Sequence, residues 1–106
     1  MNITCAKELN LYYPIQDAIE RIANIKINPK KRFDCPICGK NDATISINKN
    51  SFNCWSGHCT DGGVKTFGFV DAYFRKVEGI TDFKEIYKRI DEALNTNLYK
   101  EFKKSL

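Results

Sequence analysis

The sequence Cys35-Pro36-Ile37-Cys38, followed after 15 residues by Cys54-x4-Cys59, decides how the centre of this chain folds. Two thiolates separated by two residues lie on one tight turn and can take two corners of a coordination tetrahedron. Gly39 allows the backbone to turn beneath the metal, where N–H groups can donate to sulfur. The spacing therefore predicts one four-ligand site, with zinc as the bound ion.

The fourth ligand has two candidates, because His58 and Cys59 are adjacent. Cys59 is favoured, since it completes a second pair of thiolates with Gly62-Gly63 shortly after it. His58 would instead give three thiolates and one imidazole. Four thiolates also fit an iron–sulfur cluster, and four unrelated buried thiols are the remaining alternative. A zinc ion closed by four thiolates has no open position for a substrate, so we expect a structural role.

Composition limits the remaining classes of protein. The 106 residues are the length of a single domain, predicted here to span residues 1–106, and 42% of them are apolar. The net charge is +4. No apolar run is long enough to cross a bilayer, and no secretory signal is recognised, so we expect a cytoplasmic protein with reduced thiols. Cys5, the fifth cysteine, is expected to be a free and inert thiol.

Hydrophobic periodicity predicts an α+β fold. We expect a zinc ribbon at about residues 30–63, built on a β-hairpin with a strand at 43–47, a turn at 48–51 and a return strand at 52–54. One N-terminal helix at about 14–25 and two C-terminal helices at about 64–77 and 82–95 flank it. The first residues are expected to be irregular and the last ones frayed. The helices are expected to pack on one side of the hairpin.

Basic and aromatic side chains surround the cysteines. The sequence has seven basic and only three acidic residues between positions 26 and 65. Aromatic faces beside cations are what single-stranded nucleic acid requires, for base stacking and phosphate neutralisation. Phe33 and Phe52 are expected to fill the small core, whereas Trp55 is the candidate for stacking. The predicted contacts with nucleic acid are Lys31, Arg32, Lys49, Trp55 and Lys65. Amides of Gly62-Gly63 are a further candidate for phosphate, at an expected helix N-terminus.

The stretch from Ile15 to Leu94 resembles the N-terminal zinc-binding domain of bacterial and phage DNA primases. The resemblance rests on Cys35-Pro36-Ile37-Cys38, the hairpin strand 43–47, Cys54, and Cys59-Thr60-Asp61-Gly62-Gly63 before an aromatic-rich segment. Cellular primases usually carry His at the position of Cys38, whereas phage relatives use four cysteines. The Cys54-x4-Cys59 knuckle is two residues longer than the family pattern.

The resemblance implies a function in DNA replication. The family's domain is implied to bind a single-stranded DNA template and to help choose where a primer starts. Its polymerase site lies in a separate domain, so we expect no primer synthesis by this chain alone, and a primase catalytic domain or a helicase as partner. A phage or mobile element would suit such a module. Neither a membrane nor a small-molecule substrate is expected.

The alternative function is a protein-interaction or regulatory zinc ribbon of a replication or mobile-element protein. In that case the apolar stripes at 64–77 and 83–94 would form the contact surface, provided that they are exposed. Glutamate at Lys31 and Arg32 would weaken a DNA complex and leave a protein complex intact.

Overall fold

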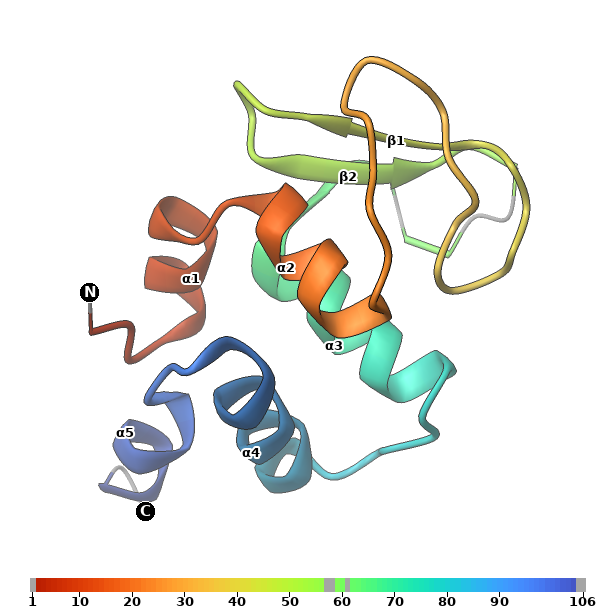
Figure 1. Cartoon of the computed structure of the whole chain (residues 1–106). Coiled ribbons are helices and arrows are strands. Elements are labelled where there is room, and N and C mark those ends of the chain that lie inside the picture. The colour runs from red at the N-terminus through yellow and green to blue at the C-terminus, as the bar shows by residue number, and fades with distance from the viewer. Residues whose placement is uncertain (1, 57–58, 61, 105–106) are drawn as a thin grey trace.

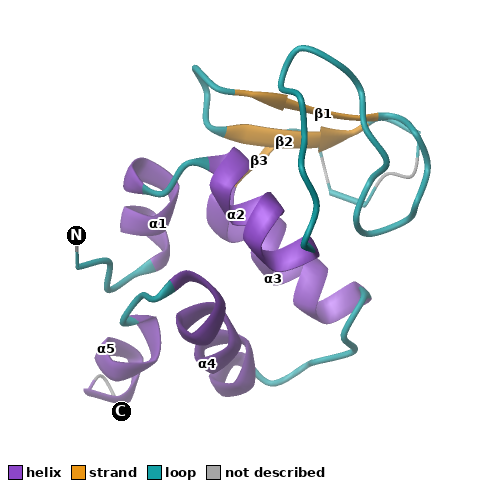
Figure 2. Cartoon of the chain, in the orientation of Figure 1, coloured by secondary structure: helices purple, strands orange, loops and turns teal. Residues whose placement is uncertain are grey.

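The computed structural model describes residues 2–56, 59–60 and 62–104, and these form the predicted α+β arrangement. A three-stranded antiparallel sheet and five helices are present in this described part (Figures 1 and 2). Figure 1 shows the helices gathered on one side of the hairpin. The elements in chain order are α1 (Ala6–Tyr12), α2 (Ile15–Ala23), β1 (Ala43–Ser46), β2 (Ser51–Cys54), β3 (Val64–Lys65), α3 (Thr66–Lys76), α4 (Phe83–Leu94) and α5 (Leu98–Lys104).

The predicted hairpin is confirmed, and its two faces differ. β1 pairs with β2 so that Ile45 lies opposite Phe52 and Thr44 opposite Asn53. Phe52 points toward the helices, is fully buried, and its ring centroid lies 4.9 Å from that of Phe69 in α3. Because side chains alternate along a strand, Thr44 and Asn53 lie on the opposite face, which we call the outer face. Burial of Phe52 and partial burial of Phe33 confirm their predicted places in the core.

The segment 64–77, predicted to be one helix, begins as a strand instead. Val64 and Lys65 pair with Phe52 and Ser51 of β2 and add the third strand, so α3 starts only at Thr66. Periodicity misses this strand because two residues are too few to show a period. Val77, expected in the apolar stripe, is 45% exposed, whereas Phe69 takes a fully buried place.

The first residues form a helix, contrary to the prediction of an irregular segment. α1 buries Leu9 completely in the core. The backbone N–H of Thr4 donates to the Glu8 carboxylate at 2.8 Å, which ties the chain to the first turn. A seven-residue helix is too short to be stable alone, so packing of Leu9 decides its formation.

α2 and α4 match their predicted positions within two residues. Pro14 is the N-cap of α2, and Asn24, with φ +56°, is its C-cap. Ile15, Ala18 and Ile19 form its buried face. Asp82 caps α4 by accepting the Lys84 N–H at 3.1 Å.

The C-terminal segment, expected to fray, forms α5. The Asp91 carboxylate accepts the backbone N–H groups of Leu98 at 2.8 Å and Tyr99 at 2.9 Å. These are N–H groups of the first turn, which has no acceptor inside its own helix. Leu98 is also buried, so the helix is held at its N-terminus by one carboxylate and one apolar contact.

Asn50, in the turn between β1 and β2, connects the sheet to three helices. Its φ is +51°, a left-handed conformation that Asn tolerates better than most residues do. Its Oδ1 accepts the Ile15 N–H at 2.7 Å, at the start of α2. Its Nδ2 donates to the carbonyls of Asn10 and Tyr13 and to the Thr66 hydroxyl, at 2.8, 3.0 and 3.1 Å. One side chain therefore fixes the tip of the hairpin to α1, α2 and α3.

Across the described residues, every helix is too short or too polar to cross a membrane.

Candidate metal centre

The first pair of cysteines lies on a closed turn. Phe33 and Ala43 form a backbone bridge that brings the two ends of this loop together. Within it the Gly39 N–H donates to the Cys35 carbonyl at 2.8 Å, and the Cys35 N–H donates to the Lys40 carbonyl at 2.9 Å. Gly39 has φ +83°, a conformation that side chains disfavour. The glycine after Cys38 thus serves the turn as the sequence predicted.

The second pair comes from β2 and the loop after it. Cys54 is the last residue of β2 and Cys59 follows in the loop, and both are buried. The Lys76 ammonium, at the C-terminal end of α3, donates to the Cys59 carbonyl at 2.5 Å. This contact could not be predicted from the sequence, because nothing local to Lys76 indicates a partner 17 residues away. His58, the alternative fourth ligand, lies outside the described residues.

The four sulfur atoms form a compact group. Their ligand atoms all lie within 4.8 Å of one another. The Cys35 and Cys59 sulfurs are 3.8 Å apart, and the Cys38 and Cys54 sulfurs 3.6 Å apart. A tetrahedral ion with metal–sulfur bonds of about 2.3 Å requires sulfurs about 3.8 Å apart. The four cysteines can therefore hold one metal ion, and Cys5, which is exposed, is not in this group.

The surroundings of the sulfurs shift their pKa values in two directions. The Lys40 N–H donates to the Cys38 sulfur and lowers the pKa of that exposed thiol to about 7. Burial raises the pKa of the Cys35 and Cys59 thiols. The Ile37 N–H also donates to the Cys35 sulfur, at 3.4 Å. A bound cation stabilises thiolates that burial otherwise disfavours.

Three of the five predicted nucleic-acid contacts gather on the outer face. Trp55 and Lys49 line a groove of about 310 Å³ that crosses β1 and β2. Lys65 lies opposite Ser51 in the sheet, and its ammonium donates to the Lys49 carbonyl at 2.7 Å. The fold thus brings together Lys49, Trp55 and Lys65, which are separated by up to 16 residues in sequence.

Arg32 and Lys31 are placed differently. Arg32 forms an ion pair with Asp42, and the Asp42 carboxylate also accepts the Ser56 hydroxyl. The Trp55 N–H donates to the Asp42 carbonyl at 3.0 Å, so Arg32 sits next to the tryptophan through Asp42. Lys31 is exposed and does not line the groove.

The prediction that Gly62-Gly63 lie at a helix N-terminus is wrong. They precede β3, and α3 starts three residues later, at Thr66. The first turn of α3 already has an acceptor, because the Phe67 N–H donates to the Asn10 side chain at 2.8 Å. Gly62 has φ +70° and its carbonyl accepts the Thr60 hydroxyl, as in a tight turn.

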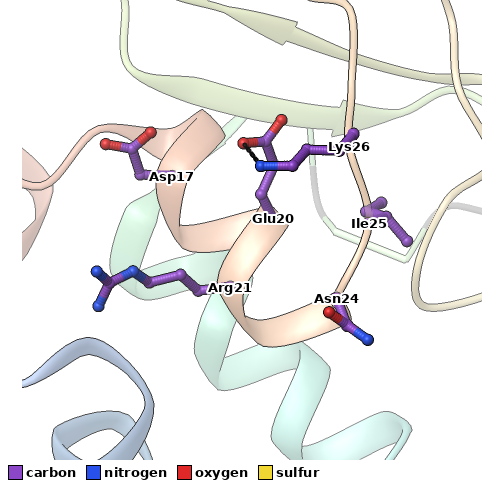
Figure 3. A pocket seen from close by; sticks show the side chains of 6 residues that line it. All are labelled: Asp17, Glu20, Arg21, Asn24, Ile25 and Lys26. Atoms are coloured by element: carbon purple, nitrogen blue, oxygen red, sulfur yellow. Dashed lines mark ion pairs between the residues drawn. The ribbon is translucent and has the colours of Figure 1, made fainter.

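A second hollow, of about 590 Å³, lies along α2 (Figure 3). It contains none of the predicted site residues. The carboxylate of Glu20 is directed to the loop after α2, where it accepts the Ile27 N–H at 3.0 Å and lies 4.0 Å from the Lys26 ammonium. That N–H lowers the pKa of Glu20. Glu20 therefore holds the segment that leads to the first cysteines, and the described residues lining the hollow form no recognisable ligand site.

Comparison with protein-family models, curated proteins and solved structures finds no match to this chain.

Proposed function

We propose that this protein is a zinc-dependent module that binds single-stranded DNA, as its resemblance to the primase zinc domain implies. The zinc is held by Cys35, Cys38, Cys54 and Cys59 and has a structural role. The groove on the outer face binds the DNA. As the resemblance implies, the module recognises a template for primer initiation in DNA replication.

Zinc is the ion that suits this ligand set. The four sulfurs form two pairs, 3.6 and 3.8 Å apart, and these distances match the separation in tetrahedral zinc coordination. Among the described residues the group contains only cysteines, which leaves zinc no ligand position for a reacting water. Metal analysis of the purified protein is expected to find one zinc per chain. Iron in its place would indicate the cluster instead.

The composition of the outer-face groove supports the proposal that this face binds DNA. Trp55 is 54% exposed, Lys49 stands at the other end of the groove, and none of the described residues lining it is acidic. An exposed aromatic ring and a cation on one polar surface supply both base stacking and phosphate neutralisation. The helices lie on the other side of the hairpin, away from the face that carries the groove (Figure 1).

Fluorescence anisotropy with labelled single-stranded DNA tests this function. We expect zinc-loaded protein to bind at low salt and more weakly at moderate salt, because bound cations are released from DNA. Trp55→Ala is expected to weaken binding by about tenfold, the loss of one stacked base. Glutamate at both Lys31 and Arg32 is expected to weaken it further. Absence of binding at tens of micromolar protein would contradict the proposal.

We also propose that the chain is not an enzyme by itself. A zinc closed by four thiolates has no open position for a reaction. Primer synthesis would then require a primase catalytic domain or a helicase as partner. Labelled oligoribonucleotides produced from template and nucleotides by the isolated chain would contradict this.

The alternative, a protein-interaction module, is supported by a different surface from the predicted one. The stripes of α3 and α4 are largely buried. Instead Leu11, Tyr12 and Ile47 are 61%, 55% and 56% exposed and line one hollow of about 320 Å³. If a partner protein uses this hollow, Tyr12→Ser would abolish its binding and leave DNA binding unchanged.

A further inference from the structure

The outer-face groove has a floor of small polar side chains. Thr44 lies opposite Asn53 and Ser46 opposite Ser51 in the pairing of β1 with β2. These four side chains carry hydroxyl or amide groups, which can both donate and accept hydrogen bonds. The groove is lined by Thr44, Ile45, Ser46, Lys49, Ser51, Asn53, Trp55 and Gly63. Such a floor suits the polar edge of a nucleobase better than it suits a phosphate, which needs donors alone.

Trp55 forms the end of this groove in a fixed orientation. Its indole Nε1–H donates to the Thr44 hydroxyl at 3.0 Å. Its backbone N–H donates to the Asp42 carbonyl at 3.0 Å, and it directly follows Cys54 of the metal centre. A ring that is held in place before binding loses less conformational entropy when a base stacks on it. The exposed indole is therefore a preorganised surface rather than a mobile side chain.

Lys49 lines the opposite end of the groove, and Lys65 lies beside it. The Lys65 ammonium donates to the Lys49 carbonyl, so it is held beside the hairpin turn. Asn53, between these lysines and Trp55, has no side-chain hydrogen bond in the described part of the chain. Its amide is available to a ligand. The cations at one end can neutralise a phosphate, and the ring at the other end can stack on a base. The free amide between them can form hydrogen bonds with the edge of that base.

We infer that this groove takes one unpaired base of a single strand, with the base stacked on Trp55 and its edge at Asn53. Thr44 is a positioning residue that acts by holding the Trp55 indole. This inference rests on the proposed function and assigns recognition of the base to the groove. Lys49 and Lys65 contribute phosphate contacts that do not depend on the base.

An octamer of abasic deoxyribose phosphates, compared with the same octamer carrying one central thymine, isolates the contribution of a single base. The zinc-loaded protein is expected to bind the thymine octamer about tenfold more tightly, the contribution of one stacked base. Trp55 is the sole tryptophan of the chain, so quenching of its fluorescence reports contact with the base directly. The abasic octamer is expected to leave this fluorescence unchanged.

Four variants separate the roles. Trp55→Ala is expected to remove the preference for thymine and to leave binding of the abasic octamer intact. Thr44→Val, which keeps the size of the side chain and removes its hydroxyl, is expected to reduce the preference about fivefold, the effect of one hydrogen bond. Thr44→Ser is expected to restore it. Lys49→Ala is expected to weaken both octamers equally and to reduce the slope of log affinity against log salt by about 0.7.

The outcomes distinguish this inference from the proposed function. Equal binding of both octamers would overturn the inference and leave DNA binding standing as contact with phosphate alone. A preference for thymine that survives Trp55→Ala would also overturn it, by placing the base elsewhere. A Thr44→Ser variant with the full defect of Thr44→Val would overturn the positioning role. Absence of binding to either octamer and to unmodified DNA would overturn the proposed function as well. Metal content and circular dichroism verify that each variant is folded.

Discussion

The cysteine region (residues 30–65) and the helical region (residues 2–26 and 66–104) are stabilised in different ways. The helical region buries most of the large apolar side chains, among them Leu9, Ile15, Ile19, Phe69, Ile86 and Ile90. In the described part of the cysteine region the buried apolar side chains are few, namely Ala43, Phe52 and the cysteines Cys35, Cys54 and Cys59. Burial of apolar area can therefore hold the helices, whereas we expect the hairpin to depend on a metal bound by the four cysteines.

Ring packing and side-chain hydrogen bonds connect the two regions. Phe52 packs on Phe69, Asn50 connects the hairpin turn to three helices, and Lys76 binds the loop of Cys59. We expect the metal to order the cysteine region and the helical core to support it. Disturbing each element of this arrangement tests it.

Loss of the metal is expected to have the largest effect. Structural zinc sites in small peptides contribute about 10–16 kcal/mol at neutral pH. Cys59→Ser is expected to release the metal and expose the amides of β1 and β2 to hydrogen exchange, while α2 and α4 stay protected. His58→Ala is the matched control and is expected to keep the metal. Metal retained by Cys59→Ser and lost by His58→Ala would move the fourth ligand to His58.

Truncation of Phe69, which packs on Phe52 between the two regions, is expected to have the second largest effect. Phe69→Ala removes a fully buried ring in contact with Phe52 and should lower the free energy of unfolding by about 3–5 kcal/mol. Phe83→Ala, at a ring that is 55% exposed beside Arg75, is expected to cost less than about 1 kcal/mol. Urea denaturation of the metal-loaded protein measures both. Similar losses for the two variants would show that the sheet does not depend on α3.

The connection through Asn50 is expected to have an intermediate effect. Asn50→Gly keeps the left-handed backbone and removes the four hydrogen bonds of the side chain, at a cost of about 2 kcal/mol. Asn50→Ala should cost about 1 kcal/mol more, because alanine disfavours positive φ. Asn24→Gly, at φ +56° but exposed, is the control and should change stability little. Equal effects at positions 24 and 50 would refute the role of the side chain.

The smallest effect is expected at α5. Asp91→Ala removes the carboxylate that caps this helix and should lower stability by about 1 kcal/mol. The loss should be confined to residues 98–104, where hydrogen exchange would become faster. Glu92→Ala, at the exposed neighbouring position, should leave the exchange unchanged. Unaltered exchange in the Asp91 variant would show that burial of Leu98 alone holds the helix.

The sequence by itself determined the parts of this protein whose signal is local. The spacing of Cys35, Cys38, Cys54 and Cys59 predicted a group of four sulfurs, and alternation along 43–54 predicted the hairpin. The helical periods predicted α2 and α4. The strands and helices repeat with the period of the element they form, so that a short window of sequence contains the information, and the cysteines are recognised by their spacing.

Tertiary structure alone decided the remaining parts. Val64 becomes a strand because β2 offers it partners, α1 forms because Leu9 is buried, and α5 forms because Asp91 reaches its first turn. The groove likewise exists because the fold places Trp55 and Lys49 on one face. All of these depend on tertiary contacts or on the placement of side chains in the folded chain, and their free energy appears only after the chain has folded.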